Sequence, residues 1–256
     1  MNLEMVKVEL LKLRRRRGLF WWSLLLTVGV PLVFFTVVEV LHLTSPEKYA
    51  AVGGIHGLEN TLGALSSAGA CAGILIGTTA GSADVSSGAF RDLVTTGRSR
   101  WGLFAARIPG VLSMILPLTV AGFAVSSVFV LGFAGANVAV GSELLIRSLG
   151  WALLATSVPA LVALGLSSLA DNRGTVIGVL IAWLFVGEPL IGGAATALGV
   201  AREGLLSLSL GRLDPVNKGA VPPDVHMGLV VATVIVAAWI GAALCAGAAR
   251  TARRDA

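Results

Sequence analysis

The sequence predicts an all-α membrane protein with six transmembrane helices, and three observations lead to that fold class. Of the 256 residues, 55% are hydrophobic and 13% are charged, and the mean hydropathy is +0.87. Soluble domains carry about a quarter charged residues. Six segments also have the roughly 20 apolar residues that a helix needs to cross a bilayer, and basic residues gather on alternate connections between them.

The expected spans begin and end where charged or turn-forming residues resume. They run from Leu19 to Val38, Thr61 to Gly81, Ile108 to Phe133, Leu149 to Leu169, Val176 to Leu198 and Met227 to Ala249. The fifth span contains Glu188 and Pro189, so a bent helix and a re-entrant segment both fit it. Residues 1–256 are expected to form a single transmembrane domain.

Orientation follows from the basic residues, because Lys and Arg flank spans on the cytoplasmic side. One side of the expected topology holds 14 of the 19 Lys and Arg residues, including the run from Arg14 to Arg17. Both termini are therefore expected in the cytoplasm. The net charge of +5 reflects this topology, so nucleic acid is not expected as a partner. Arginine outnumbers lysine 15 to 4 and Ala, Gly and Val are abundant, which indicates a GC-rich bacterial gene. The expected location is therefore a bacterial cytoplasmic membrane.

Residues 1–17 are expected to form a helix lying in the membrane interface. Leu3, Val6, Leu10 and Leu13 recur at three- and four-residue spacing and share one helical face. The alternative is an ordinary basic flank that only sets orientation. At the other end of the layout, residues 199–226 are expected to be an extracytoplasmic connection that caps the spans, since several prolines interrupt it.

Glu188 is an acid within a hydrophobic stretch, WLFVGEPLIGG. A carboxylate inside a membrane is costly unless it faces water or a partner, so Glu188 is a candidate contact for a substrate or an ion. The alternative is structural: with Pro189 beside it, Glu188 would cap a break in the fifth span.

Sequence motifs of enzymes are missing. The sequence has no H-E-x-x-H pair, no G-x-S-x-G elbow and no G-x-x-x-x-G-K-[ST] phosphate loop. The three histidines and two cysteines show no metal-ligand spacing. The chain is therefore expected not to be an enzyme and to bind no metal or cofactor; any ATP hydrolysis would occur on another chain.

Four glycines recur at four-residue spacing in the second span: Gly69, Gly73, Gly77 and Gly81. They lie nearly on one line of a helix, where they allow another backbone to approach closely. The sequence leaves the partner open between a helix of the same chain, a subunit interface and a transport path.

The connection after this glycine ridge reads SADVSSGAFRDLVTTGRSRWGLFAAR. Phe90, Leu93 and Val94 have helical spacing, which predicts a short amphipathic helix. The basic residues around it, Arg91, Arg98 and Arg100, make the segment a plausible docking element for another protein. It is longer than a minimal turn requires.

This pattern resembles the membrane subunits of type-two ABC exporters. Their second and third spans are joined by an acid, hydroxyl residues, a glycine pair, an apolar helix, a break, a Ser-Arg pair and a basic residue. The matching positions here are Asp84, Gly88-Ala89, Leu93 with Val94, Gly97, Ser99-Arg100 and Arg107. The amphipathic start resembles the elbow helix of that family, and VGEPL at 186–190 resembles a motif in the fifth span of some bacterial members. The likeness covers the whole six-span layout.

The resemblance implies a permease subunit of an ATP-driven exporter. It implies an ABC ATPase subunit that binds ATP and Mg²⁺, a second permease copy or paralogue, and a coupling helix within residues 83–103. The implied ATPase-coupling residues are Asp84, Gly88, Arg91, Asp92, Gly97, Arg98, Ser99 and Arg100. Two alternatives remain: an ion-coupled secondary transporter that uses Glu188, and a non-transporting membrane assembly factor. The apolar spans suit a lipid, a drug or a peptide equally.

Overall fold

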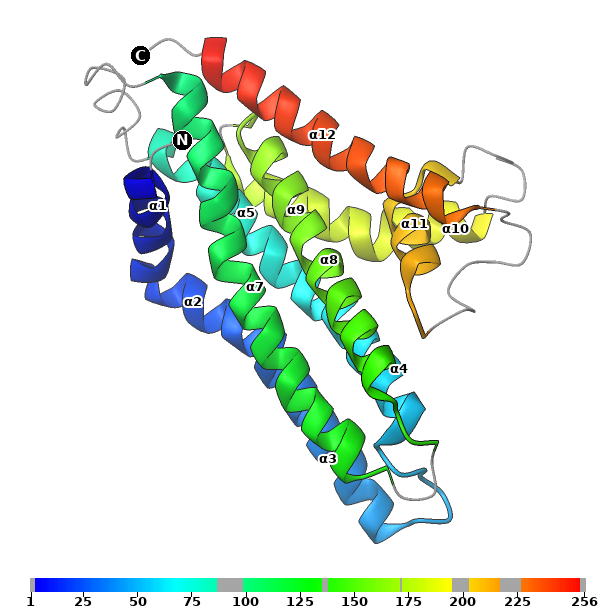
Figure 1. The fold of residues 1–256 in the computed structure, drawn as a ribbon. Helices are drawn as coiled ribbons and strands as arrows, with labels where there is room; N and C mark the ends of the chain where they lie inside the picture. The colour runs from blue at the N-terminus through cyan, green and yellow to red at the C-terminus, as the bar shows by residue number, and fades with distance from the viewer. Residues whose placement is uncertain are drawn as a thin grey trace.

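The computed structural model describes residues 3–86, 99–134, 138–170, 172–194, 203–216 and 227–253. All regular structure within these ranges is helical, and six helices are long and apolar enough to cross a membrane (Figure 1). The predicted all-α fold with six spans is confirmed, and the chain is a multi-pass membrane protein. The prediction that residues 1–17 lie in the membrane interface is not tested by the structure.

The helices have the following bounds. A first helix, α1 (Leu3–Arg15), precedes span one, which consists of α2 (Arg17–Leu24), the π-helical turn η1 (Leu25–Gly29) and α3 (Val30–Thr44). Span two consists of α4 (Gly54–Ala64), η2 (Leu65–Gly69) and α5 (Ala70–Ser86); spans three and four are α7 (Arg100–Gly132) and α8 (Ser142–Ser167). Span five consists of α9 (Arg173–Ala182), η3 (Trp183–Gly187) and α10 (Glu188–Ala194), and α11 (Leu206–Leu213) precedes span six, α12 (Leu229–Arg253).

Spans two and four form the centre of the bundle, and spans one, five and six are mostly exposed. Helix α1 and the last turn of α12 lie at the same end of the molecule, which we call the terminal end (Figure 1). Away from that end, spans five and six diverge from spans one to three, and α11 lies beside α12 (Figure 1). The exposed surfaces of the outer spans are apolar, as the hydrocarbon core of a bilayer requires.

The glycine ridge of span two packs on span four of the same chain. A Cβ atom on Gly73 would lie 2.6 Å from the carbonyl oxygen of Thr156, and one on Gly77 would overlap the carbonyl oxygen of Ala160. Gly69 and Gly81 make equally close contacts with side chains of α8. The backbones of α5 and α8 therefore touch from Gly73 to Gly81, which selects the first of the three partners that the sequence left open.

Glycine also lies at the crossing of α8 with α12. A Cβ on Gly247 would lie 2.6 Å from the carbonyl oxygen of Gly165, and one on Gly165 would overlap the backbone of Ala243. Without a hydrophobic driving force between helices in lipid, such close backbone contacts supply much of the association energy. Span four is thus held on two sides by glycine contacts.

The connection between spans two and three is shorter than predicted. Helix α5 continues past Gly81 to Ser86, and the Ser82 hydroxyl donates a hydrogen bond of 2.8 Å to the Thr78 carbonyl within it. Helix α7 begins at Arg100, eight residues before the predicted start, because Ser99 caps it by accepting from the Gly102 N–H at 3.4 Å. No proline interrupts either extension, so each apolar helix runs on into polar sequence.

Span five is a helix through Ala194 that contains a π-helical turn, Trp183–Gly187, immediately before Glu188. A π turn accommodates one extra residue and is frequent at functional sites. Over Arg173–Ala194 the span is thus one continuous helix, as the bent-helix alternative expects. Spans one and two contain similar π turns, and all three end at a glycine: Gly29, Gly69 and Gly187.

Candidate functional site

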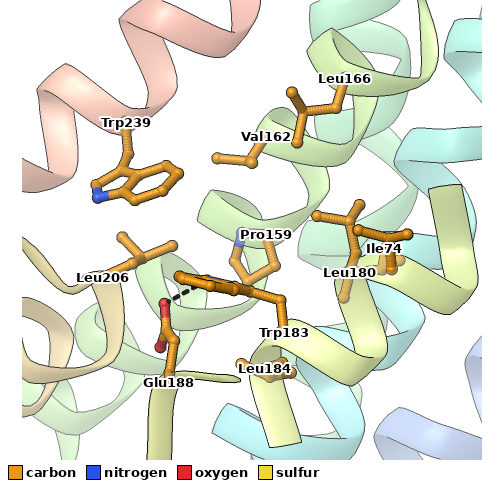
Figure 2. Close-up of a pocket in the computed structure, with 11 residues that line it drawn as sticks. Ile74, Pro159, Val162, Leu166, Leu180, Trp183, Leu184, Glu188, Leu206 and Trp239 are labelled. Atoms are coloured by element: carbon orange, nitrogen blue, oxygen red, sulfur yellow. Dashed lines mark hydrogen bonds between the residues drawn. The ribbon is translucent and has the colours of Figure 1, made fainter. Parts of the chain in front are cut away.

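Two adjoining hollows lie between spans two, four, five and six. The first has a volume of about 270 Å³ and is almost entirely apolar. Its wall includes Ile74 of α5, Val162 and Leu166 of α8, Leu180 of α9 and Trp239 of α12 (Figure 2). We call this hollow the apolar half of the cavity.

The second hollow, the polar half of the cavity, has a volume of about 290 Å³. Its polar wall residues are Glu59, Ser66, Ser67, Ser207 and Asp214. The two halves share four wall residues, Pro159, Leu184, Glu188 and Leu206. The cavity therefore changes from apolar to polar along its length, and Glu188 lies at the junction.

Glu188 is 3% exposed, and both of its carboxylate oxygens accept hydrogen bonds. Oε1 accepts from the indole N–H of Trp183 at 3.1 Å (Figure 2). Oε2 accepts from the backbone N–H of Ser207 at 3.0 Å. Both donors are neutral. No Lys or Arg of the described residues forms an ion pair with Glu188, so its charge is buried without a compensating cation there.

Three hydrogen bonds fasten α11 and the residues just before it to three spans. Glu188 holds the first turn of α11 through Ser207, as an acidic group at a helix N-terminus does. The indole N–H of Trp151 in α8 donates to the Leu210 carbonyl at 2.9 Å, and that of Trp239 in α12 donates to the Gly204 carbonyl at 3.0 Å. Helix α11 is thus fixed as one wall of the cavity.

Replacing Glu188 with Gln should loosen α11. A glutamine side chain is neutral and has one acceptor oxygen, and its NH₂ group would face an N–H donor, so one of the two hydrogen bonds is lost and the other loses the charge on its acceptor. Hydrogen bonds to a charged group contribute about 1.5–3 kcal/mol. We expect hydrogen exchange at the backbone N–H of Ser207 to accelerate about tenfold or more, measured by mass spectrometry on the purified chain.

The matched control for this substitution is Glu143→Gln. Glu143 is an exposed carboxylate that pairs with Arg147 at 2.6 Å within α8. It should leave exchange in α11 unchanged. Equal exchange rates at Ser207 in the Glu188→Gln variant and the parent chain would show that Glu188 does not hold α11.

A second polar arrangement joins helices at the terminal end. Arg107 of α7 is 1% exposed, and its Nη1 donates to the carbonyl oxygen of Gly81, the last ridge glycine, at 3.2 Å. Arg100 Nη1 donates to the Ala252 carbonyl near the end of α12 at 3.1 Å. The ends of spans two, three and six are therefore linked through two arginines of α7.

Replacing Arg107 with Met should destabilise the bundle. Methionine can fill part of the space but cannot donate to the Gly81 carbonyl, and losing a partner of a buried polar group costs about 1–3 kcal/mol. We expect a lower thermal unfolding temperature in detergent, whereas Arg147→Met, at an exposed arginine on α8, should change it little. Identical unfolding of the two variants would contradict this role of Arg107.

The structure places only some of the predicted coupling residues. Ser99 caps α7, and Arg100 contacts α12, so neither is free to serve docking alone. Asp84 lies in the last turns of α5, but its side chain is outside the described residues. Gly88, Arg91, Asp92, Gly97 and Arg98 also lie outside them.

The glycine ridge and Glu188 are brought to the same part of the fold. Gly73 and Gly77 pack on α8 beside Ala160, next to the cavity wall residue Pro159. Sequence reasoning missed the cavity, the tryptophans that hold α11 and the burial of Arg107. Within the described ranges, no group of three or more His, Cys, Asp or Glu residues could hold a metal ion.

Six apolar spans, with a cavity between spans two, four, five and six, define a multi-pass helical membrane protein. A family model described as ABC-2 family transporter protein matches residues 5–187. The chain belongs to this family, which confirms the resemblance. The family is a membrane transport component that works with an ABC ATPase subunit and is not itself the ATPase. No curated protein matches the chain.

Proposed function

We propose that the chain is the permease subunit of an ATP-driven ABC exporter in a bacterial cytoplasmic membrane. A separate ATPase subunit would bind ATP and Mg²⁺ and hydrolyse the nucleotide, and this chain would bind no cofactor. The observation that carries the proposal is the family match over residues 5–187, combined with a sequence of 256 residues that contains no phosphate-binding loop.

In this proposal the terminal end of the bundle faces the cytoplasm. The exposed run Arg14–Arg17 lies at the start of span one, and Arg250 and Arg253 lie in the last turns of span six. Positive residues flank spans on the cytoplasmic side, which supports this orientation. Residues 199–226 would then be extracytoplasmic.

Residues 83–103 would dock on the ATPase through Asp84, Gly88, Arg91, Asp92, Gly97, Arg98, Ser99 and Arg100. The ends of this segment belong to α5 and α7. Movement of the segment would therefore act directly on α5, and the glycine ridge would pass that movement to α8. The Arg100 contact with Ala252 would extend it to span six. Such coupling requires helices that can occupy two packed arrangements.

A second permease copy or a paralogue would complete the transporter. Spans one and five carry exposed apolar side chains over most of their length, and either lipid or another span can cover such a surface.

Copurification tests the proposal. The tagged chain is expressed in its own organism, extracted in mild detergent and purified, and its partners are identified by mass spectrometry. We expect a protein with a G-x-x-x-x-G-K-[ST] loop in near-stoichiometric amount and ATP hydrolysis by the complex. A chain that purifies alone and whose membranes show no associated ATPase would contradict the proposal.

The buried position of Glu188 at the cavity favours one alternative, an ion-coupled secondary transporter in which Glu188 carries the coupling ion. That alternative predicts transport by the purified chain alone, driven by an ion gradient and abolished by Glu188→Gln. A membrane assembly factor would show neither ATP coupling nor transport.

A further inference from the structure

The cavity combines an apolar half with a polar half whose charged wall residues all have one sign. The three ionisable wall residues are Glu59, Glu188 and Asp214. Among the residues that the structure describes, no Lys, Arg or His lines either half. Of the three ionisable wall residues, Glu59 is contacted by His56 at 3.2 Å, and Glu188 accepts only from neutral donors.

Glu188 gives the strongest single indication of ligand charge. A carboxylate that is 3% exposed and receives only two neutral N–H donors is stabilised far less than one paired with a cation. A positively charged ligand group at the junction of the two halves would supply the missing counter-charge. Coulomb attraction at such a buried site is several times stronger than in water.

Tryptophan rings reinforce the same ligand class. Trp183 and Trp239 line the apolar half, and Trp183 lies directly beside Glu188 (Figure 2). Indole faces attract cations through their quadrupole and also provide apolar surface. A carboxylate next to indole rings therefore suits an organic cation, in which the positive charge is surrounded by hydrocarbon.

We propose that this cavity binds a hydrophobic organic cation, with its charge beside Glu188 and the acidic polar half, and its hydrocarbon groups in the apolar half. This deepens the proposed function, on which it rests, by naming the substrate class of the transporter. The polar half is lined by Glu59, near the start of span two, and by residues of α11. In the proposed orientation the polar half is nearer the outer surface of the membrane than the apolar half. The charged group of the ligand would therefore point outward and its hydrocarbon groups inward, as in a cationic amphiphile in the outer leaflet.

The test compares two probes of the same shape and opposite charge, tetraphenylphosphonium and tetraphenylborate. Binding of each radiolabelled ion to the purified chain in nanodiscs is measured by equilibrium dialysis, and binding to empty nanodiscs is subtracted. We expect saturable binding of the phosphonium ion with about one site per chain, and at least tenfold weaker binding of the borate. Equal saturable binding of both ions, or no saturable phosphonium binding, would overturn the proposal.

Substitutions locate the site. Glu188→Gln is expected to weaken phosphonium binding about tenfold or more, and Glu59→Gln, at a half-exposed wall residue with no role in holding α11, is expected to weaken it severalfold. Glu143→Gln, outside the cavity, should not change it. If Glu188→Gln lowers the unfolding temperature severely, its binding result cannot be used, and phosphonium binding by Glu59→Gln then tests the site. Unchanged binding in the folded wall variants would place the cation elsewhere and contradict the proposal.

These outcomes are independent of the ATPase test, because dialysis uses the chain alone. Selective cation binding without a copurifying ATPase would support the proposed cation site and contradict the proposal that the chain belongs to an ATP-driven exporter. If an ATPase copurifies but the chain binds the two probe ions equally, the exporter proposal is supported and the proposed substrate class is contradicted.

Discussion

Gly77→Leu should abolish recovery of folded protein. A Cβ at this position already overlaps the carbonyl oxygen of Ala160 and would lie 3.0 Å from the backbone nitrogen of Leu164. These are backbone atoms of the central helix pair, which cannot rotate away as a side chain can. Leucine would force α5 and α8 apart along the ridge. The measurement is size-exclusion chromatography and thermal unfolding of the detergent-purified variant.

The graded variant and its control make this test specific. Gly77→Ala adds only the overlapping Cβ, and we expect a loss of about 1–3 kcal/mol, as for overpacked cores. Gly63 lies in the same span with no atom near its would-be Cβ, so Gly63→Ala should unfold at nearly the parent temperature. If Gly77→Leu is recovered as well folded as Gly63→Ala, the ridge does not hold the two spans together.

Arg91→Glu should uncouple ATP hydrolysis from the permease. In the proposed complex Arg91 lies on the amphipathic segment that docks on the ATPase, and reversing its charge replaces attraction with repulsion at that contact. We expect substrate-stimulated ATP hydrolysis of the reconstituted complex to fall severalfold, toward the unstimulated rate. Membrane insertion and recovery of the chain should be unchanged.

The choice of Arg91 over Arg100 follows from the structure. Arg100 donates to the Ala252 carbonyl, so its reversal would also remove a contact within the chain, and a loss of coupling would have two causes. Arg147→Glu is the matched control, because it reverses an exposed arginine on α8, outside the docking segment. Coupling that survives Arg91→Glu, or is equally reduced by Arg147→Glu, would argue against docking through this segment.

The sequence was sufficient for the fold class because hydropathy and charge are local signals. The six apolar segments and the four-residue glycine spacing can be read from the sequence, because each depends only on residues that are neighbours within one helix. Span ends were less well predicted. A start at Arg100 depends on the cap by Ser99, and the extension of α5 to Ser86 depends on the absence of any helix breaker.

The cavity could not be predicted because its wall comes from elements far apart in the chain. Glu59, Pro159, Glu188 and Leu206 lie in four helical elements, α4, α8, α10 and α11, and they meet only after these elements pack together. The sequence did identify Glu188 as exceptional, and it offered a structural cap and a ligand contact as alternatives. The carboxylate holds α11, which is a different structural role from the predicted cap of a break in span five, and it also lines the cavity. The burial of Arg107 was not predicted either. The sequence identified it only as a position of the family motif, and its contact with Gly81 depends on how α5 and α7 cross.

Site-specific photocrosslinking can show whether an ATPase docks on the segment between spans two and three. A photoreactive amino acid is placed at position 91, and in a control chain at position 147, and native membranes are irradiated. The account predicts an adduct from position 91 with a protein that carries a phosphate-binding loop, and none from position 147. No ATPase adduct from position 91, or equal adducts from both positions, would contradict it.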